Sequence, residues 1–343
     1  MSVDDASDFR LTLLGRWLRE ELGFTDGRIV PASTDASFRR YFRVTRGGDT
    51  YIAMDAPPAK ESLGPYLHVA GMLAGMDLHV PAVLARNLQQ GFLLLTDLGT
   101  RQYLEDLARD RDVDQLFTDA LGALVHMQAG GREIGRMLPN YDRALLVKEM
   151  QLMPEWFLHR HLRLDLDAGQ RAMLERLYAV LLQSAQAQPA SFVHRVYHSR
   201  NLMVCEENNP GILDFQDAVY GPLTYDLVSL LKDCYIDWPS ARVRGWILQY
   251  RGLLRRADID PDVSHSQFMR WFDLMGLQRH IKVLGIFSRL FYRDHKPQYL
   301  KDLPRVLHYA RDAAAEYADT AEFAEFLAAH ETQFEQAQAR AFP

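Results

Sequence analysis

The sequence HRVYHSRNLMV occupies residues 194–204 and is followed at residues 211–218 by GILDFQDA. Two short apolar runs in this stretch, 202–205 and 211–215, flank a polar turn that contains Glu, Asn and Pro residues. Apolar runs of this length on either side of such a turn predict a β-hairpin. A hairpin that interrupts helical sequence carries a polar loop at each end, and these loops are where chemistry is expected.

Asn201 and Asp214 stand at opposite ends of this predicted hairpin. An amide oxygen and a carboxylate are hard ligands, and they suit Mg²⁺ better than zinc or copper. Taken alone, Asn201 is better explained as a turn residue and Asp214 as the end of a strand. Their occurrence together on one hairpin favours a magnesium site.

The rest of the chain divides into a strand-rich first part and a helical remainder. Leucines at three- and four-residue intervals predict an opening helix over 9–22. The next predicted elements are a hairpin of strands 37–44 and 51–54 that turns at 46–49, a helix over 66–73, a strand over 80–84 and a buried strand over 91–99. Helical periodicity then dominates to about residue 188, most clearly over 115–128 and 171–182, and the alanine- and glutamate-rich tail over 310–341 predicts one or two surface helices. This order predicts an α+β fold.

Composition narrows the class of protein. The 343 residues, 48% of them hydrophobic, fit two lobes with a substantial core. Two cysteines are too few for a disulfide framework and fit a reducing compartment, so we expect a cytoplasmic protein. The acidic amino terminus argues against a secretory signal. No apolar run approaches the roughly 18 residues that a membrane span needs. The net charge of −6 argues against a nucleic-acid partner. The oligomeric state stays open.

Several sequence words resemble one known superfamily. The spacing from His194 to Asn201, the word DFQDA at 214–218 and the word GPLTYDL at 221–227 are similar to the catalytic and metal-binding loops of the protein-kinase-like fold used by aminoglycoside phosphotransferases and choline kinases. The words DASFRRYFR at 35–43, MDAPP at 54–58 and HSRNL at 198–202 look like those of bacterial cell-wall-recycling kinases, which phosphorylate the anomeric C1 hydroxyl of N-acetylmuramate and N-acetylglucosamine. The resemblance runs from about residue 9 to 310.

This resemblance implies a two-lobed protein-kinase-like fold, with a β-rich lobe over 1–96 and a helical lobe over 97–343, and a kinase that uses ATP and Mg²⁺ on a small amino sugar. It places the metal at Asn201 and Asp214 and a structural brace at Asp226. The implied nucleotide-binding residues are Ser33, Thr34, Asp35, Ser37, Arg39, Arg43, Thr96, Asp97 and Leu98. The implied catalytic positions are His194, Val196 and His198, and those facing the acceptor are Asp217, Arg279, Arg289 and Trp156.

Val196 is the main departure from the family pattern. Kinases of this kind carry an aspartate at this position, which accepts or orients the proton of the attacking hydroxyl. General-base assistance is worth roughly 10²–10⁴-fold in rate. His198 is the nearest alternative base. The expectation is therefore an impaired kinase; a nucleotide-binding pseudokinase without turnover is the alternative.

A missing cation and the substrate class are two further points. The strand lysine of protein kinases is replaced by Met54, and the sequence has no glycine-rich loop. Arg39, Arg40 or Arg43 therefore either contacts the phosphates or is simply solvated.

Residues 270–305 contain eight Lys and Arg against three Asp. This excess favours an anionic acceptor such as N-acetylmuramate over an aminoglycoside, unless these residues form a solvated helical face. Trp156 either stacks on a sugar or belongs to the core.

Overall fold

The computed structural model describes residues 3–25, 28–33 and 38–342, and only the backbone of residues 3–8 and 33. Thr34, Asp35 and Ser37, which the resemblance assigns to the nucleotide, lie outside the described residues. The chain forms two units. Unit 1 comprises Met1–Gln102 and Leu202–Asp217, and unit 2 comprises Tyr103–Asn201 and Ala218–Pro343. This division differs from the boundary at 96/97 expected from the sequence, which stays a prediction.

Unit 1 is built on an antiparallel sheet whose strand order is β1-β2-β3-β5-β4. Its elements are β1 (Val30–Ser33), β2 (Arg40–Arg46), β3 (Asp49–Asp55), β4 (Val83–Asn87), β5 (Phe92–Thr96) and the helices α1 (Val3–Glu20) and α2 (Leu63–Gly75). The predicted hairpin is confirmed as β2–β3, and Gly47 and Gly48 adopt φ of 61° and 94° at its turn, where a side chain would be strained. The predicted helices 9–22 and 66–73 are confirmed as α1 and α2.

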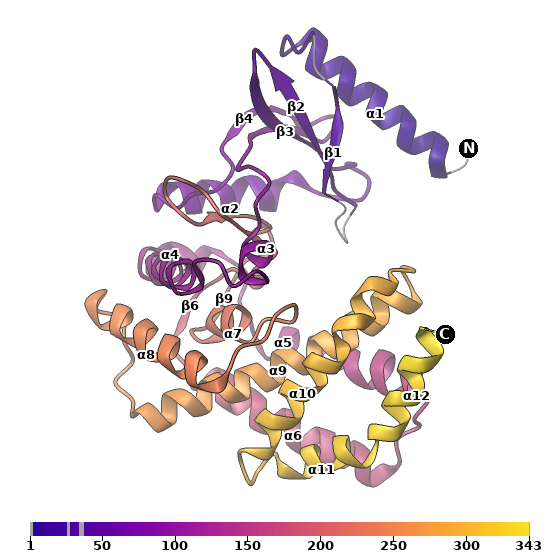
Figure 1. Ribbon diagram of the computed structural model, residues 1–343, viewed down its shortest axis with the longest axis vertical. Helices are drawn as coiled ribbons and strands as arrows, with labels where there is room; N and C mark the ends of the chain where they lie inside the picture. Colours follow the sequence, from indigo (N-terminus) through magenta and orange to yellow (C-terminus); the bar gives the residue numbers. More distant parts are fainter. Residues whose placement is uncertain (1–2, 26–27, 34–37, 343) are drawn as a thin grey trace. The chain divides into compact units, whose positions relative to one another are not determined.

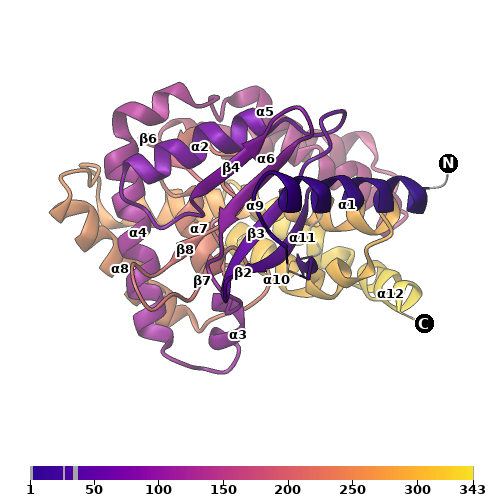
Figure 2. The same cartoon turned by 90° about the horizontal axis from the view of Figure 1, so that it is seen from above.

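Helix α1 lies on one face of this sheet (Figure 2). Leu14, Trp17 and Leu18 of α1 are buried against Phe42 and Phe92, and burial of each such side chain contributes roughly 1.5–3 kcal/mol. A buried ion pair fixes the helix further, because Arg10 Nε donates to Asp55 Oδ1 at 2.8 Å and Arg40 Nε donates to Asp55 Oδ2 at 3.0 Å. This packing holds the β2–β3 hairpin in place.

The short hairpin of residues 202–217 belongs to unit 1. Its strands β7 (Leu202–Met203) and β8 (Gly211–Ile212) pair antiparallel, which confirms the predicted hairpin. Ile212 N donates to His79 O at 2.8 Å, and Val204 N donates to Arg101 O at 2.8 Å. These bonds attach the hairpin to the segment between α2 and β4 and to the chain that follows β5.

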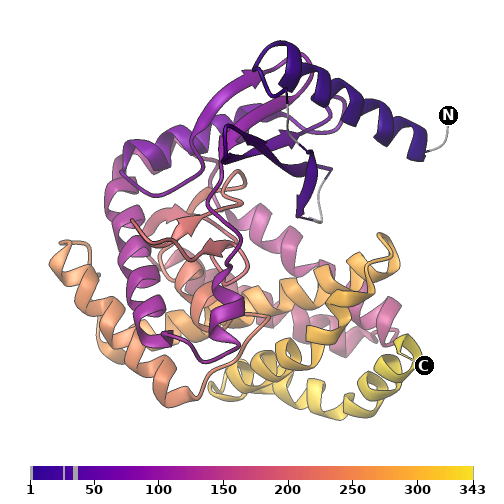
Figure 3. The same ribbon diagram turned by 45° about the horizontal axis from the view of Figure 1, so that its top comes forward.

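Unit 2 is almost entirely helical, and its elements follow from magenta to yellow in Figures 1 and 3. Its helices are α3 (Tyr103–Leu107), α4 (Val113–Ile134), η1 (Gly135–Met137), α5 (Arg143–Met150), η2 (Met153–His161), α6 (Ala168–Gln186), α7 (Tyr225–Leu231), α8 (Ser240–Arg256), α9 (His265–Tyr292), η3 (Pro297–Asp302), α10 (Leu303–Ala315), α11 (Ala321–Ala329) and α12 (Glu331–Ala341). The helices predicted over 115–128, over 171–182 and in the tail are confirmed. A two-stranded pairing of β6 (Ala190–Val193) with β9 (Val219–Pro222) was not predicted.

Helix α9 runs through the interior of unit 2, and most of its residues are buried. The π-helix η2 packs closely on it at Gly285, where an added Cβ would lie 2.4 Å from the Leu152 carbonyl carbon. Glycine is therefore required at 285 for the two helices to approach. Among the described residues, no helix combines the length and apolar character that crossing a membrane requires. The architecture is the expected α+β, with a small antiparallel sheet in unit 1 and helices in unit 2.

Candidate functional site

Residues 194–201 form a tight loop in unit 2, directly after strand β6. Asp226, at the start of α7, accepts hydrogen bonds from His194 N at 2.6 Å and from Arg195 N at 2.9 Å. Its carboxylate is fully buried, and burial raises its pKa to about 7 although both N–H groups act in the opposite direction. Asp226 therefore holds the first two residues of the loop.

Val196 lies at the centre of this loop, with a half-buried side chain that has no proton acceptor. Its carbonyl accepts hydrogen bonds from His198 N and from Asn201 Nδ2, both at 3.0 Å. The bond to Nδ2 fixes the nitrogen end of the Asn201 amide toward the loop and so sets the direction of its oxygen. His194 Nδ1 accepts from Val196 N at 3.3 Å, which makes this nitrogen the unprotonated one.

His198 is the other base considered from the sequence. Burial, together with the nearby charges of Arg279 and Arg200, lowers its pKa to about 3. A group with this pKa stays neutral at physiological pH but accepts a proton only weakly. The arrangement thus gives no support to His198 as a substitute for a carboxylate at position 196.

A buried charge network holds the side chain of Arg195. Arg195 and Lys282 both bond to Glu149 Oε1, the lysine at 2.8 Å, and Tyr141 donates to Glu149 Oε2. Burial alone would raise the pKa of Glu149, but the charges of Lys282 and Arg195 lower it to about 2. Arg195 adopts φ of 81°, a left-handed conformation that is strained for any residue with a side chain. We call Glu149, Arg195, Lys282 and Tyr141 the Glu149 cluster. This cluster therefore stabilises the strained backbone conformation of Arg195, next to position 196.

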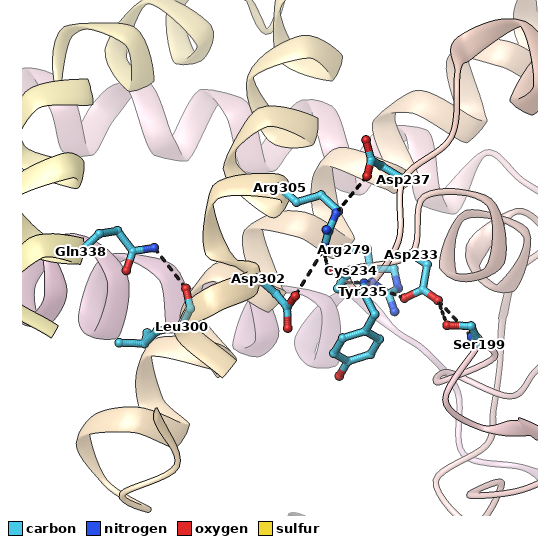
Figure 4. A network of polar contacts seen from close by, with 10 residues as sticks. All are labelled: Ser199, Asp233, Cys234, Tyr235, Asp237, Arg279, Leu300, Asp302, Arg305 and Gln338. Atoms are coloured by element: carbon cyan, nitrogen blue, oxygen red, sulfur yellow. Dashed lines mark hydrogen bonds and ion pairs between the residues drawn. The ribbon is translucent and has the colours of Figure 1, made fainter. Parts of the chain in front are cut away.

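Figure 4 shows a second set of polar contacts that begins at the same loop. Asp233 Oδ2 accepts from Ser199 N at 3.0 Å and from Ser199 Oγ at 2.5 Å. Arg279 donates from Nη1 to Cys234 Sγ at 3.1 Å and from Nε to Ser229 Oγ at 2.7 Å. Arg279 is only 4% exposed, so what the structure shows is an interior role in holding the 233–235 turn, and its expected contact with an acceptor stays a prediction.

Two other residues were assigned to the acceptor in unit 2. Trp156 in η2 is half-buried, and the Arg160 guanidinium lies 5.6 Å from its ring centroid. Arg289 is partly buried, and burial together with Arg293 lowers its pKa. Both roles remain predictions.

Of the two residues expected to hold a metal, Asp214 lies in unit 1 and Asn201 in unit 2. Asp214 adopts φ of 62°, and its Oδ1 accepts from Gln216 Nε2 at 2.7 Å. The ring of Phe215 packs 4.9 Å from that of Tyr66 in α2. Burial raises the pKa of Tyr66, and Arg39 and Asp214 are both near enough to shift it in opposite directions. Asp217 is exposed. The expected roles of Arg39, Asp214 and Asp217 stay predictions.

The remaining nucleotide candidates surround the end of β5. Arg43 donates from Nε to Asp97 Oδ2 at 2.5 Å and from Nη2 to Gly99 O at 2.8 Å, so Arg43 and Asp97 pair with each other. Thr96 Oγ1 accepts from Ala82 N at 2.9 Å, and Leu98 O accepts from Cys205 Sγ at 3.8 Å. These contacts order the segment that follows the sheet.

The resemblance of the loop words implies a metal at Asn201 and Asp214. Within residues 3–25, 28–33 and 38–342, no group of three His, Cys, Asp or Glu side chains forms a metal cluster. The donor set that the sequence offers is one amide and one carboxylate, and these hard oxygens fit Mg²⁺ when phosphate oxygens and water complete its coordination. Sequence reasoning missed Glu149, Lys282 and Tyr66, because a charge or a tyrosine on a predicted helix carries no signal of its partner.

Buried histidines make the folded chain sensitive to acid. Burial lowers the pKa of His198 and His280 to about 3 and, with Arg340 nearby, that of His161 to about 4. The unfolded chain has pKa values near 6.5 for these groups and so binds protons that the folded chain excludes. Stability is therefore lost as pH falls below about 6.5. Asp226 acts in the opposite sense between pH 7 and 4, because its folded pKa is raised.

The three histidines should together lower the free energy of unfolding by about 4 kcal/mol between pH 7.5 and 5.5, about 1.4 kcal/mol each. Burial raises the pKa of Asp226, Asp233, Asp273 and Asp302, so these carboxylates act in the opposite sense as pH falls. Urea unfolding followed by fluorescence at both pH values isolates the histidine contribution when His198→Gln is compared with the unchanged protein: the variant should lose about 1.4 kcal/mol less stability on going to pH 5.5. Replacement of the exposed His308 by Gln should leave the pH dependence unchanged. The same pH dependence with and without His198 would contradict this reading.

The chain is similar to proteins of known classes. Residues 28–261 match the model of the phosphotransferase enzyme family. An N-acetylmuramate/N-acetylglucosamine kinase of Pseudomonas aeruginosa is 45% identical over 333 residues, with 94% of this chain and 97% of that protein covered. A protein of the same name from Neisseria meningitidis is 40% identical over 312 residues, with 90% and 92% covered.

Solved structures agree on the fold. Choline kinase from Streptococcus pneumoniae superposes with a TM-score of 0.63 at 10% identity, with 87% of this chain and 99% of that chain covered. The GDP complex of aminoglycoside 2′-phosphotransferase-IIIa gives a TM-score of 0.59 at 17% identity, with 90% and 99% covered. The protein-kinase-like fold expected from the loop words is thereby confirmed. The chain belongs to the phosphotransferase enzyme family.

Proposed function

We propose that this protein transfers the γ-phosphoryl group of ATP to the anomeric C1 hydroxyl of N-acetylmuramate and N-acetylglucosamine, in the cytoplasmic recycling of cell-wall sugars. The observation that carries the proposal is the 45% identity, over 94% of the chain, to a kinase named for these two sugars. The products are a sugar 1-phosphate and ADP. The hydroxyl proton leaves with a general base, or with solvent where no base is present.

Bound Mg²⁺–ATP supplies the phosphoryl group and neutralises much of its charge. In this proposal Asn201 and Asp214 give oxygen ligands to the metal, and Arg39 supplies the cation that Met54 cannot. Asp226 and the Glu149 cluster hold the loop backbone, so that residue 196 and Asn201 keep fixed positions. The hydrogen bonds that set these positions in unit 2 support this part of the proposal.

Val196 limits the rate in this proposal. Positioning and metal electrostatics still act, since phosphoryl transfer depends on them heavily. Proton acceptance by the protein is absent, because valine has no acceptor and His198 has a pKa of about 3. A pseudokinase that binds nucleotide without turnover is the second candidate, and Val196 is the observation that favours it.

Titration calorimetry of the chain as it stands tests the proposal. Mg²⁺–ATP should bind, and N-acetylmuramate and N-acetylglucosamine should each bind to the nucleotide-loaded protein, while kanamycin should not. Asp214→Asn is the matched variant, and it should lose the Mg²⁺ dependence of nucleotide binding. Nucleotide binding without either sugar would favour the pseudokinase, and binding of kanamycin alone would favour an aminoglycoside acceptor.

A further inference from the structure

Arg200 has no role in the function proposed above. It lies in the loop of residues 194–201, one residue before Asn201 and four after Val196. Its guanidinium carbon lies 3.6 Å from the ring centroid of Tyr235, which is stacking distance. The side chain is half-buried, and it forms no hydrogen bond or ion pair with any residue in the described part of the chain. A part-buried guanidinium in this state retains donors for an anion.

The support beneath Arg200 is rigid. Tyr235 N donates to Asp233 Oδ1 at 3.1 Å, and the other oxygen of Asp233 holds Ser199, the residue before Arg200 (Figure 4). The ring of Tyr235 packs edge-on against His198 with centroids 5.3 Å apart, and against Phe287 at 6.2 Å. The buried carboxylate of Asp233 therefore holds the backbone on both sides: Ser199, which precedes Arg200, and Tyr235, whose ring lies against the Arg200 guanidinium.

The nearby acidic side chains are already engaged. Asp233 is 1% exposed and bonded to Ser199 and Tyr235, as described above. Burial raises the pKa of Asp302, and the charges of Arg200 and Arg305 act against this rise. Asp302 pairs with Arg305, whose Nη1 lies 3.2 Å from Asp302 Oδ1. An Arg that stacks on an aromatic ring presents its N–H edge in the plane of the guanidinium, a fork that matches the two oxygens of a carboxylate.

We propose that Arg200, stacked on Tyr235, binds an oxyanion of the reacting ligands, and we assign it to the carboxylate of an acidic amino sugar such as N-acetylmuramate. This inference rests on the proposed function and adds the residue that distinguishes the acidic sugar from the neutral one. The γ-phosphoryl group is the other oxyanion source. We assign the carboxylate because residues 270–305 carry eight Lys and Arg against three Asp, which favours an acidic acceptor, and because Phe287 of this segment packs on Tyr235, the ring on which Arg200 lies.

The test is calorimetric measurement of sugar binding in the presence of Mg²⁺ and a non-hydrolysable ATP analogue. No phosphoryl transfer takes place under these conditions, so the missing proton acceptor at position 196 does not affect the result. Three probes are used: N-acetylmuramate, its uncharged methyl ester and N-acetylglucosamine. Arg200→Gln should weaken N-acetylmuramate binding by roughly ten- to a hundredfold and leave the other two within about threefold. Arg200→Lys, which keeps the charge but not the fork, should lose less.

Arg293→Gln is the matched control, because Arg293 is an exposed arginine of unit 2 that pairs with Asp294. It should leave binding of all three probes unchanged. Unchanged N-acetylglucosamine affinity also shows that Arg200→Gln is folded; if that variant does not fold, Arg200→Lys carries the comparison.

Equal loss for both sugars overturns the carboxylate assignment. The ATP analogue is titrated separately into the same variants, and a loss confined to it assigns Arg200 to the phosphoryl group. No loss for any probe overturns the anion role altogether. Wild-type protein that binds neither sugar overturns the proposed function and this inference with it, whereas sugar binding that Arg200→Gln does not alter overturns the inference alone.

Discussion

Val196→Asp is expected to raise kcat for phosphorylation of N-acetylmuramate by at least about a hundredfold, within the range of roughly 10²–10⁴ that general-base assistance provides. The rest of the loop is already in place, because the Val196 carbonyl is bonded to His198 N and Asn201 Nδ2 and these backbone contacts do not depend on the side chain at 196. The substitution therefore adds a proton acceptor to a formed loop. Initial rates of ADP release at saturating Mg²⁺–ATP measure the gain.

Val196→Asn is the matched control for this experiment. Asparagine has the size of aspartate and can orient a hydroxyl, but it does not accept a proton at neutral pH. We expect less than about a tenth of the aspartate gain. Equal rates for the two variants would assign the effect to orientation rather than proton transfer. A gain below a hundredfold for Val196→Asp would leave the pseudokinase reading as the better one.

Glu149→Gln is expected to lower the free energy of unfolding by about 3–5 kcal/mol, the cost of leaving buried charges without their partner. The side chain of Glu149 is 6% exposed and is the shared partner of Arg195 and Lys282, so both cations lose their counter-charge together. Guanidinium unfolding measures the loss. Glu133→Gln is the control, because the Glu133 side chain is 77% exposed and its pairing with Arg136 spans 3.7 Å; it should cost less than about 0.5 kcal/mol.

The same variant tests whether the Glu149 cluster positions the loop. In the Val196→Asp background, Glu149→Gln should lower kcat more than it raises KM, since the left-handed backbone at Arg195 loses the side-chain anchor next to residue 196. Glu149→Asp, which restores the charge on a shorter side chain, should recover part of the rate. A Glu149→Gln protein as stable as the wild type, or one changed only in KM, would contradict the positioning role.

The fold was predictable where the information is local. The β2–β3 hairpin follows from two aromatic and β-branched runs separated by Gly47 and Gly48, and α1 follows from its leucine spacing. The pairing of β6 with β9 was not predictable, because residues 194–218 separate these strands in the sequence and each run is too short to indicate its partner. Pro81, which has no N–H, precedes the observed start of β4 at Val83 and explains why the strand begins later than expected.

The sequence predicts the motif residues of the candidate site but not the buried residues that hold them in position. The spacing of His194, Asn201 and Asp214 is written in the sequence, and so is the valine at 196. The Glu149 cluster is not, because a glutamate and a lysine on helices are ordinarily solvated, and only the tertiary structure brings them together in the interior. The interior position of Arg279 was hidden for the same reason: charge counts along residues 270–305 do not tell which face each helical residue occupies.

The most direct measurement of the central claim is phosphorus NMR of a mixture of the Val196→Asp protein, Mg²⁺–ATP and N-acetylmuramate, with N-acetylglucosamine and kanamycin run in parallel. ADP and one new phosphomonoester signal should grow at equal rates for each sugar. That signal should couple to the anomeric proton, the reducing end should disappear at the same rate, and kanamycin should stay unchanged. ADP without a sugar phosphate, a phosphate at another hydroxyl, or a product from kanamycin alone would contradict it.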